Sequence, residues 1–204
     1  MKYYRLQRGA KDVNPVFKNW EETTQKLTGT LKAVYLNDAK TVPKKDWTGD
    51  VTIPANMAIV FEEDVTVQVN YELGSLFRTL ANSLLSVKLG DMVQLYLYNK
   101  TYTKQDWTKG TTKTVSVTNP AKQVERKRKD WTAFTANEMY SWAVEYKDIP
   151  EVEIIKNKKG EFVSSDDSEA NEFFIDKLTE TFVTPNKKAE GSSDEINVED
   201  IPFN

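Results

Sequence analysis

The 204-residue chain contains no cysteine and no histidine. Without these two residue types, the usual zinc sites, thiol nucleophiles and Ser-His triads are excluded. Catalysis would have to rest on carboxylates, Lys, Tyr or a carboxylate-bound Mg²⁺, and the scattered acidic residues form no motif for it. The sequence also has no G-x-x-x-x-G-K-[ST] or G-x-G-x-x-G phosphate loop. We therefore predict a protein that is not an enzyme and that has no catalytic residues, metal or cofactor.

Long apolar runs are missing as well. No run approaches the ~20 residues that a membrane-spanning helix needs, and the basic, aromatic N-terminus lacks the apolar region of a signal peptide. The absence of cysteine gives no indication of a disulfide-stapled secreted domain. These absences favour a cytoplasmic protein that has no membrane partner.

Charge is distributed unevenly along the chain. Residues 1–147 hold 22 basic and 16 acidic side chains, a net charge of +6, whereas residues 148–204 hold 6 and 15, a net charge of −9. Such an asymmetry is typical of a body that binds a polyanion and of a tail that acts as a separate interaction arm. On charge alone, a mildly basic domain with a solubilising tail fits equally well.

Alternating apolar and polar residues predict a mainly β fold. The first long strand is interrupted by Gly29, which indicates a bulge, and two later strands flank an acidic turn at 62–64. Between the strands, one stretch takes a helical period that begins at Ser75, a candidate N-cap, and ends near Lys88. The strand patterns lie within 25–38, 55–72, 92–102, 112–118 and 131–134.

This order of elements is that of an OB-fold, a five-stranded Greek-key barrel, here with one helix between its third and fourth strands. We expect the barrel domain to occupy residues 1–150. An extension at 151–183 follows, with a helix predicted over 168–183. Polar and acidic residues dominate 184–204, which is typical of a disordered, flexible acidic tail.

The strand at 92–102 places Tyr96, Tyr98, Lys100 and Tyr102 on its polar face. Bases of single-stranded nucleic acid stack on such rings, while lysine neutralises the phosphates between them. Two alternatives remain for this face. The N-terminal arm or the C-terminal helix covers the rings, or the rings form the interface of a homo-oligomer, for which a dimer is favoured.

Three stretches repeat a pattern of basic residues followed by Asp-Trp-Thr: KKDWT (44–48), KQDWT (104–108) and RKDWT (128–132). Such a tryptophan is suited to stack on a base, although each can equally fold back onto its own domain. The basic run at 122–129 supplies the charge that a backbone-tracking groove needs, although charge runs are usually solvated surface. The candidate residues for binding single-stranded DNA are Lys32, Trp47, Tyr96, Tyr98, Lys100, Tyr102, Trp107, Lys109, Arg126, Arg128 and Trp131.

The final residues, EDIPFN, resemble the C-terminal tip of bacterial single-stranded DNA-binding proteins, in which Ile-Pro-Phe follows an Asp-rich stretch. Many phage proteins of this class also carry an acidic tail with an aromatic tip behind an OB-fold. The resemblance implies a phage-type protein that coats and protects single strands in replication, recombination and repair, in the host cytoplasm. It also implies that replication and recombination proteins dock on Glu199, Asp200, Ile201, Pro202 and Phe203.

The tip departs from the family's pattern at one position. The family's tip ends at its Phe, whereas Asn204 follows here, which favours a phage's own replication proteins as partners. Another class of function also remains open for the chain. It is a protein-interaction or oligomeric structural protein that uses the exposed tyrosine face and binds no nucleic acid.

Overall fold

The largest sheet in the described part of the protein has nine strands, in the order β11-β10-β9-β4-β7-β8-β1-β2-β3. The structure is a computed structural model that describes residues 1–10, 13–43, 49–103, 109–160 and 162–183. Two further hairpins pair only with themselves, β5 with β6 and β12 with β13. The strands are β1 (Lys2–Gln7), β2 (Val16–Lys18), β3 (Thr23–Thr24), β4 (Lys26–Asn37), β5 (Lys40–Pro43), β6 (Asp50–Ile53), β7 (Asn56–Phe61), β8 (Val65–Asn70), β9 (Met92–Thr103), β10 (Lys109–Lys127), β11 (Ala133–Met139), β12 (Glu153–Lys156) and β13 (Phe162–Asp166).

Strand β4 changes its partner half-way along its length. Its first residues pair with β9 and its later residues pair with β7. Gly29 lies just before this change, and a Cβ at that position would stand 2.8 Å from the Cβ of Phe61. Glycine is therefore required for the two strands to pack this closely. The register with β7 shifts between Leu31 and Ala33, so the predicted bulge is present just after the glycine.

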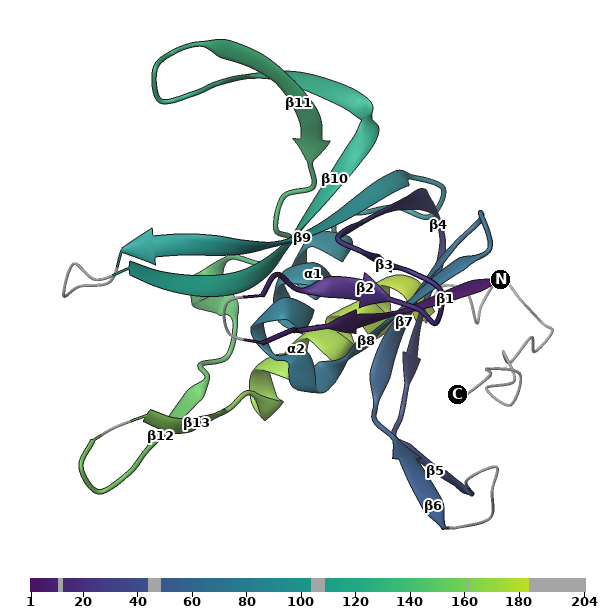
Figure 1. Cartoon of the computed structure of the whole chain (residues 1–204), viewed down its shortest axis with the longest axis vertical. Coiled ribbons are helices and arrows are strands. Elements are labelled where there is room, and N and C mark those ends of the chain that lie inside the picture. The colour runs from purple at the N-terminus through teal and green to yellow at the C-terminus, as the bar shows by residue number, and fades with distance from the viewer. Residues whose placement is uncertain (11–12, 44–48, 104–108, 161, 184–204) are drawn as a thin grey trace.

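The core lies between the sheet and two helices. Helix α1 (Ser75–Leu84) turns Leu76, Phe77 and Leu80 inwards, and α2 (Ser168–Leu178) continues as a π-helical turn at Thr179–Val183. Both helices lie behind β1 and β2 in the view of Figure 1. The helix predicted over 168–183 is therefore present. Two short 3-10 turns lie at Tyr71–Leu73 and Tyr146–Asp148.

The mainly β fold, with one helix between β8 and β9, agrees with the sequence prediction. Within the described ranges, however, the sheet has edges at β11 and β3, so the structure shows no closed barrel. The place beside β8 is taken by the N-terminal strand β1, which runs parallel to it. Strands β1, β2 and β3 were not predicted, because the N-terminal sequence shows no clear period.

Helix α1 is shorter than its apolar pattern predicts. It ends at Leu84 rather than near Lys88, and Val87 remains buried because its N–H bonds to the Leu84 carbonyl in a turn. The predicted N-cap, Ser75, is instead the first helical residue. The N-cap is Gly74, whose φ of 55° favours glycine.

Candidate nucleic-acid interface

Strand β9 divides its side chains between the core and the surface. Val93, Leu95 and Leu97 are fully buried, whereas Tyr96 on the other face is 44% exposed. The rings of Tyr96 and Tyr98 are stacked, with their centroids 5.6 Å apart and their planes 15° apart. This face continues through the exposed Lys100 and Tyr102. We call Tyr96, Tyr98, Lys100 and Tyr102 the tyrosine row.

The last ring of the row rests on a glycine. Tyr102 pairs with Gly110 of β10, and a Cβ on residue 110 would lie only 2.5 Å from Cζ of the tyrosine. The ring therefore lies directly across the glycine backbone, where a larger residue would push it away. The contact holds the ring in place. The side chain of Tyr102 is still 46% exposed, so part of the ring remains accessible.

Polar side chains from both neighbouring strands share the face of the tyrosine row. On one side, β10 places Thr114 opposite Tyr98 and Ser116 opposite Tyr96. On the other side, the exposed Lys26 of β4 is the register partner of Tyr96. Hydroxyl and ammonium groups are common donors to phosphate oxygens. The sequence analysis missed Lys26, although it belongs to the predicted strand at 25–38, because the partner of that strand was unknown.

The N-terminal segment packs on the opposite face of the β9–β10 ladder. Lys113 and Asn99 form a register pair. Their neighbours along both strands lie on the face of the tyrosine row, so the side chains of Lys113 and Asn99 lie on the opposite face. The Asn99 N–H donates a hydrogen bond to Oδ1 of Asn14, at 3.2 Å. The Lys113 ammonium donates to four carbonyls of the same segment, those of Arg8, Gly9, Ala10 and Val13.

This arrangement bears on the two segments that were candidates to cover the tyrosine row. The described part of the N-terminal arm is held on the other face by Lys113. Helix α2 buries Ala170, Phe174 and Leu178 within the body. Within the ranges that the structure describes, Tyr96 and Tyr102 thus keep large exposed surfaces.

The basic run at 122–129 was expected to separate two strands, at 112–118 and 131–134. This prediction is wrong, because the run lies mainly within a strand. It forms the end of β10, which pairs with β11 and projects from the body as a curved hairpin (Figure 1). Both faces of this hairpin are solvated, so it lacks the apolar alternation that marks a strand in a sequence. Arg126 pairs with Phe134, and the guanidinium carbon of Arg128 lies 5.3 Å from the centre of the Phe134 ring.

The tip of this hairpin presents Trp131 to solvent. Oδ1 of Asp130 accepts hydrogen bonds from the Thr132 hydroxyl at 2.6 Å and from the Thr132 N–H at 3.1 Å. These bonds, the hydroxyl's first, hold the pKa of Asp130 below its ordinary value. Trp131 has a φ of 65° and is 78% exposed, and the Lys127 ammonium lies 5.8 Å from its ring centre. This indole therefore does not fold back onto the body.

The remaining predicted residues lie at the start of β10, on another part of β4 or outside the described residues. Lys109 is exposed at the start of β10, opposite Thr103 at the end of β9. Lys32 is exposed on β4, but beyond the point at which this strand leaves β9 for β7. Two of the predicted tryptophans and the whole acidic tip lie outside the described residues: Trp47, Trp107, Glu199, Asp200, Ile201, Pro202 and Phe203.

The structure therefore places part of the predicted set along strand β10. The tyrosine row and Lys109 lie near the start of this strand. Arg126 lies near its end, and Arg128 and Trp131 follow in the turn to β11. In the described ranges, no group of three or more acidic side chains is arranged to hold a metal ion, and no helix is long and apolar enough to cross a membrane. Comparisons with protein-family models, curated proteins and solved structures found no match to this chain.

Proposed function

We propose that this chain is a non-catalytic protein that binds single-stranded DNA without sequence preference. In this role it coats and protects strands during replication, recombination and repair, and it recruits partner proteins through its acidic C-terminal tail. The observation that carries the proposal is the tyrosine row. Three rings and a lysine stand on one exposed strand face, while Lys113 holds the N-terminal segment on the opposite face.

The spacing of the row suits a flexible strand of DNA. The row extends over seven residues of β9, from Tyr96 to Tyr102. At the usual rise of a β-strand, this is a length of ~20 Å. Bases stack on Tyr96, Tyr98 and Tyr102, while Lys100 and the neighbouring Lys26 meet phosphates. Every base has a flat face, so such stacking discriminates little between sequences.

The arrangement of elements supports an OB-like domain. The five strands β4, β7, β8, β9 and β10, with α1 between the third and the fourth, follow the element order of an OB-fold. OB-folds bind oligonucleotides with the loops that join strands 1 and 2 and strands 4 and 5. In this chain the corresponding connections contain the KKDWT and KQDWT stretches. Their sequences provide the tryptophan and lysine residues that such a role requires.

The tail supplies the recruiting half of the proposal. Ile201 and Phe203 are suited to an apolar pocket, and the acidic residues before them are suited to basic residues around it. Replacing Phe203 by Ala removes the ring and leaves every tail charge in place. We expect this variant to lose replication partners in a pull-down and to keep its affinity for DNA. Recovery of every partner by the variant would contradict the docking role.

The test of DNA binding is a titration of intrinsic tryptophan fluorescence with a 30-nucleotide oligo-dT, followed by back-titration with salt. We expect saturable quenching at low salt, with log affinity falling by about 0.7 per contacted phosphate for each log unit of salt. An unchanged signal together with an unshifted band in gel electrophoresis would end the proposal. If the tyrosine variants bind normally but lose an oligomer, the alternative of a structural protein is correct.

A further inference from the structure

The hairpin β12–β13 projects from the body as an arm with its own chemistry (Figure 1). Ile154 is paired with Ser165, Val163 lies where the register shifts, and both apolar side chains are 58% exposed. Ile155, which follows Ile154 and so faces the other side of the hairpin, is exposed as well. Two-stranded hairpins are at best marginally stable in water, and grouped apolar side chains on a surface mark interaction sites. The arm therefore carries a surface that a protein partner would cover.

The root of this arm is fixed to both helices. Arg78 of α1 forms an ion pair with Asp167 at 3.1 Å, and only 16% and 23% of the two side chains are exposed. The guanidinium also donates to Oδ1 of Asn171 on α2, at 3.2 Å. A Cβ on Gly74 would collide with the Asp167 carboxylate, so the contact is tight on that side too. These contacts fix the residue that follows β13, and with it the start of α2, against α1.

The tip of the arm is basic. Lys156, Lys158 and Lys159 are exposed around the turn at Asn157–Gly160, and the Lys159 N–H donates to Oδ1 of Asn157 at 2.9 Å. The arm thus combines aliphatic side chains along its strands with ammonium groups at its end. A partner surface that fits it would pair apolar side chains with nearby carboxylates.

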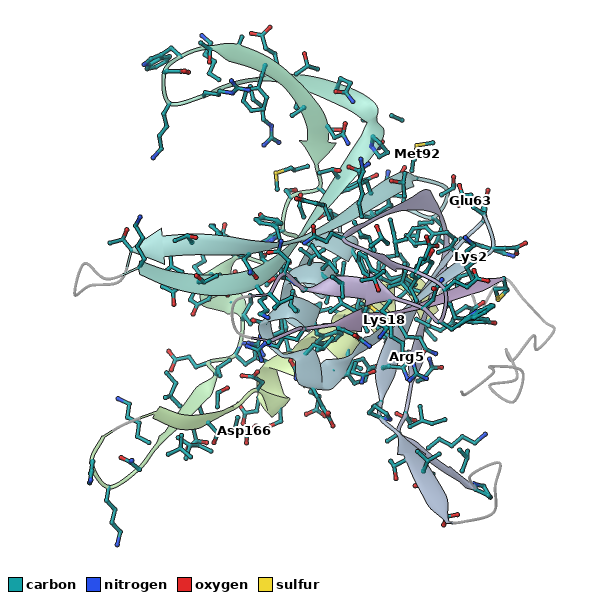
Figure 2. The ribbon with its side chains drawn as sticks, viewed as in Figure 1. Lys2, Arg5, Lys18, Glu63, Met92 and Asp166 are labelled. Atoms are coloured by element: carbon teal, nitrogen blue, oxygen red, sulfur yellow. The ribbon has the colours of Figure 1, made fainter. Side chains whose placement is uncertain are left out.

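The molecule has such a surface on another side of the body. The β7–β8 turn exposes Glu62, Glu63 and Asp64, and Glu63 accepts a 2.9 Å hydrogen bond from the N–H of Thr30. Thr30 pairs with Met92, which is exposed, as is Leu89 in the preceding turn. In Figure 2, Glu63 and Met92 lie on the upper right of the body, whereas Asp166 at the root of the arm lies at the lower left.

We propose that the β12–β13 arm of one copy docks on the acidic end of a second copy. Its lysines meet Glu62 and Asp64, while its aliphatic side chains cover Met92 and Leu89. Because the two surfaces are different and lie on different sides of the molecule, the contact is head-to-tail and extends into an open row of copies.

This inference rests on the proposed function for its biological use. Copies bound to one strand of DNA are held near one another, which raises their effective concentration for a weak contact. Met92 shares a face of β9 with the tyrosine row, so a docked copy stands beside the path proposed for DNA. The strand would then run from one copy to the next.

The experiment uses charge reversal at both ends of the intact chain, measured by sedimentation velocity over a range of concentrations without DNA. The arm variant is Lys158→Glu with Lys159→Glu, and the acidic-end variant is Glu62→Lys with Asp64→Lys. The control, Lys40→Glu with Lys147→Glu, makes the same change in net charge as the arm variant, at exposed lysines elsewhere. We expect the wild type and the control to self-associate, and each end variant to lower the association constant about tenfold.

The four substitutions combined should restore association, because the reversed charges again attract one another. A wild type that stays monomeric, or a combined variant that fails to recover, overturns the inference. Circular dichroism of each variant establishes that it is folded. Binding of an oligo-dT that accommodates one copy is measured in parallel: its absence refutes the proposed function alone, while the pattern of self-association still decides the docking.

Discussion

Two arms of the molecule, β10–β11 and β12–β13, are both hairpins with basic tips, yet they differ in every other respect. The first extends the nine-stranded sheet and places Arg128 against Phe134 and Trp131 at its tip. The second pairs only with itself and exposes Ile154 and Val163 beside its lysines. Planar guanidinium and aromatic groups suit phosphates and bases, whereas branched aliphatic side chains suit protein surfaces. Similar backbones thus indicate different partners.

The largest effect on DNA affinity should come from the tyrosine row, which lies toward the opposite end of β10 from the first arm. Replacing Tyr96, Tyr98 or Tyr102 by Ala should each cost ~1–3 kcal/mol of binding to oligo-dT, because each ring stacks on a base. Fluorescence titration at constant salt measures the loss. The control is Tyr146→Ala, which removes a more exposed ring outside the row. An equal loss in the control would show that the row has no special role.

The root of the second arm should have the next largest effect, on stability. Arg78→Met leaves the mostly buried Asp167 carboxylate without its partner, and we expect urea unfolding to show a loss of about 2 kcal/mol. The matched control is Lys177→Met, because its ion pair with Glu180 is exposed and should contribute ~0–1 kcal/mol. Arg78→Met should also weaken self-association while binding to a short oligo-dT persists. Equal stability of the two variants would contradict a fixed root.

Single cations should separate the two arms by their salt dependence. Arg126→Ala and Arg128→Ala should each flatten the slope of log affinity against log salt by about 0.7, the value for one lost contact to a single strand. Lys158→Ala on the second arm should leave the slope for a short oligo-dT unchanged. If the lysine variant flattens the slope as much as the arginine variants do, both arms touch DNA and the division between them fails.

The smallest expected effect is that of pH. At the tip of the first arm and at the root of the second, an Asp carboxylate accepts hydrogen bonds from the residue two positions later. Hydroxyl and N–H groups of Thr132 and Ser168 lower the pKa of Asp130 and Asp166, respectively. A carboxylate whose pKa is lowered by folding stabilises the folded turn above its ordinary pKa, and this contribution is lost as pH falls through the lowered value. The amide resonances of Thr132 and Ser168 should therefore titrate below the ordinary pKa of Asp. Midpoints at the ordinary value would contradict these hydrogen bonds.

Parts of this structure follow from local sequence patterns. The alternation in β9 predicts both its buried residues and its tyrosine row, because one side of the strand meets a core. The same rule fails for the end of β10, because a hairpin that is solvated on both faces has no apolar side. It also fails for β1, where Tyr4 and Leu6 are buried but the other face carries Tyr3, so apolar and polar residues do not alternate clearly.

The exposure of the tyrosine row was not predictable from sequence. It depends on contacts between Lys113 and Arg8, Gly9 and Val13, which lie about a hundred positions earlier in the chain. No local pattern indicates which face of a ladder such a distant segment will cover.

The most direct test of the account is to find which side chains touch the bases. Oligo-dT substituted with bromodeoxyuridine, bound to the intact chain and irradiated, forms cross-links to aromatic side chains that lie against the bases, and peptide mass spectrometry locates them. We predict cross-links at Tyr96, Tyr98 or Tyr102, with a further one at Trp131. Cross-links confined to the β12–β13 arm or to Tyr146, with the tyrosine row unmodified, would contradict the account.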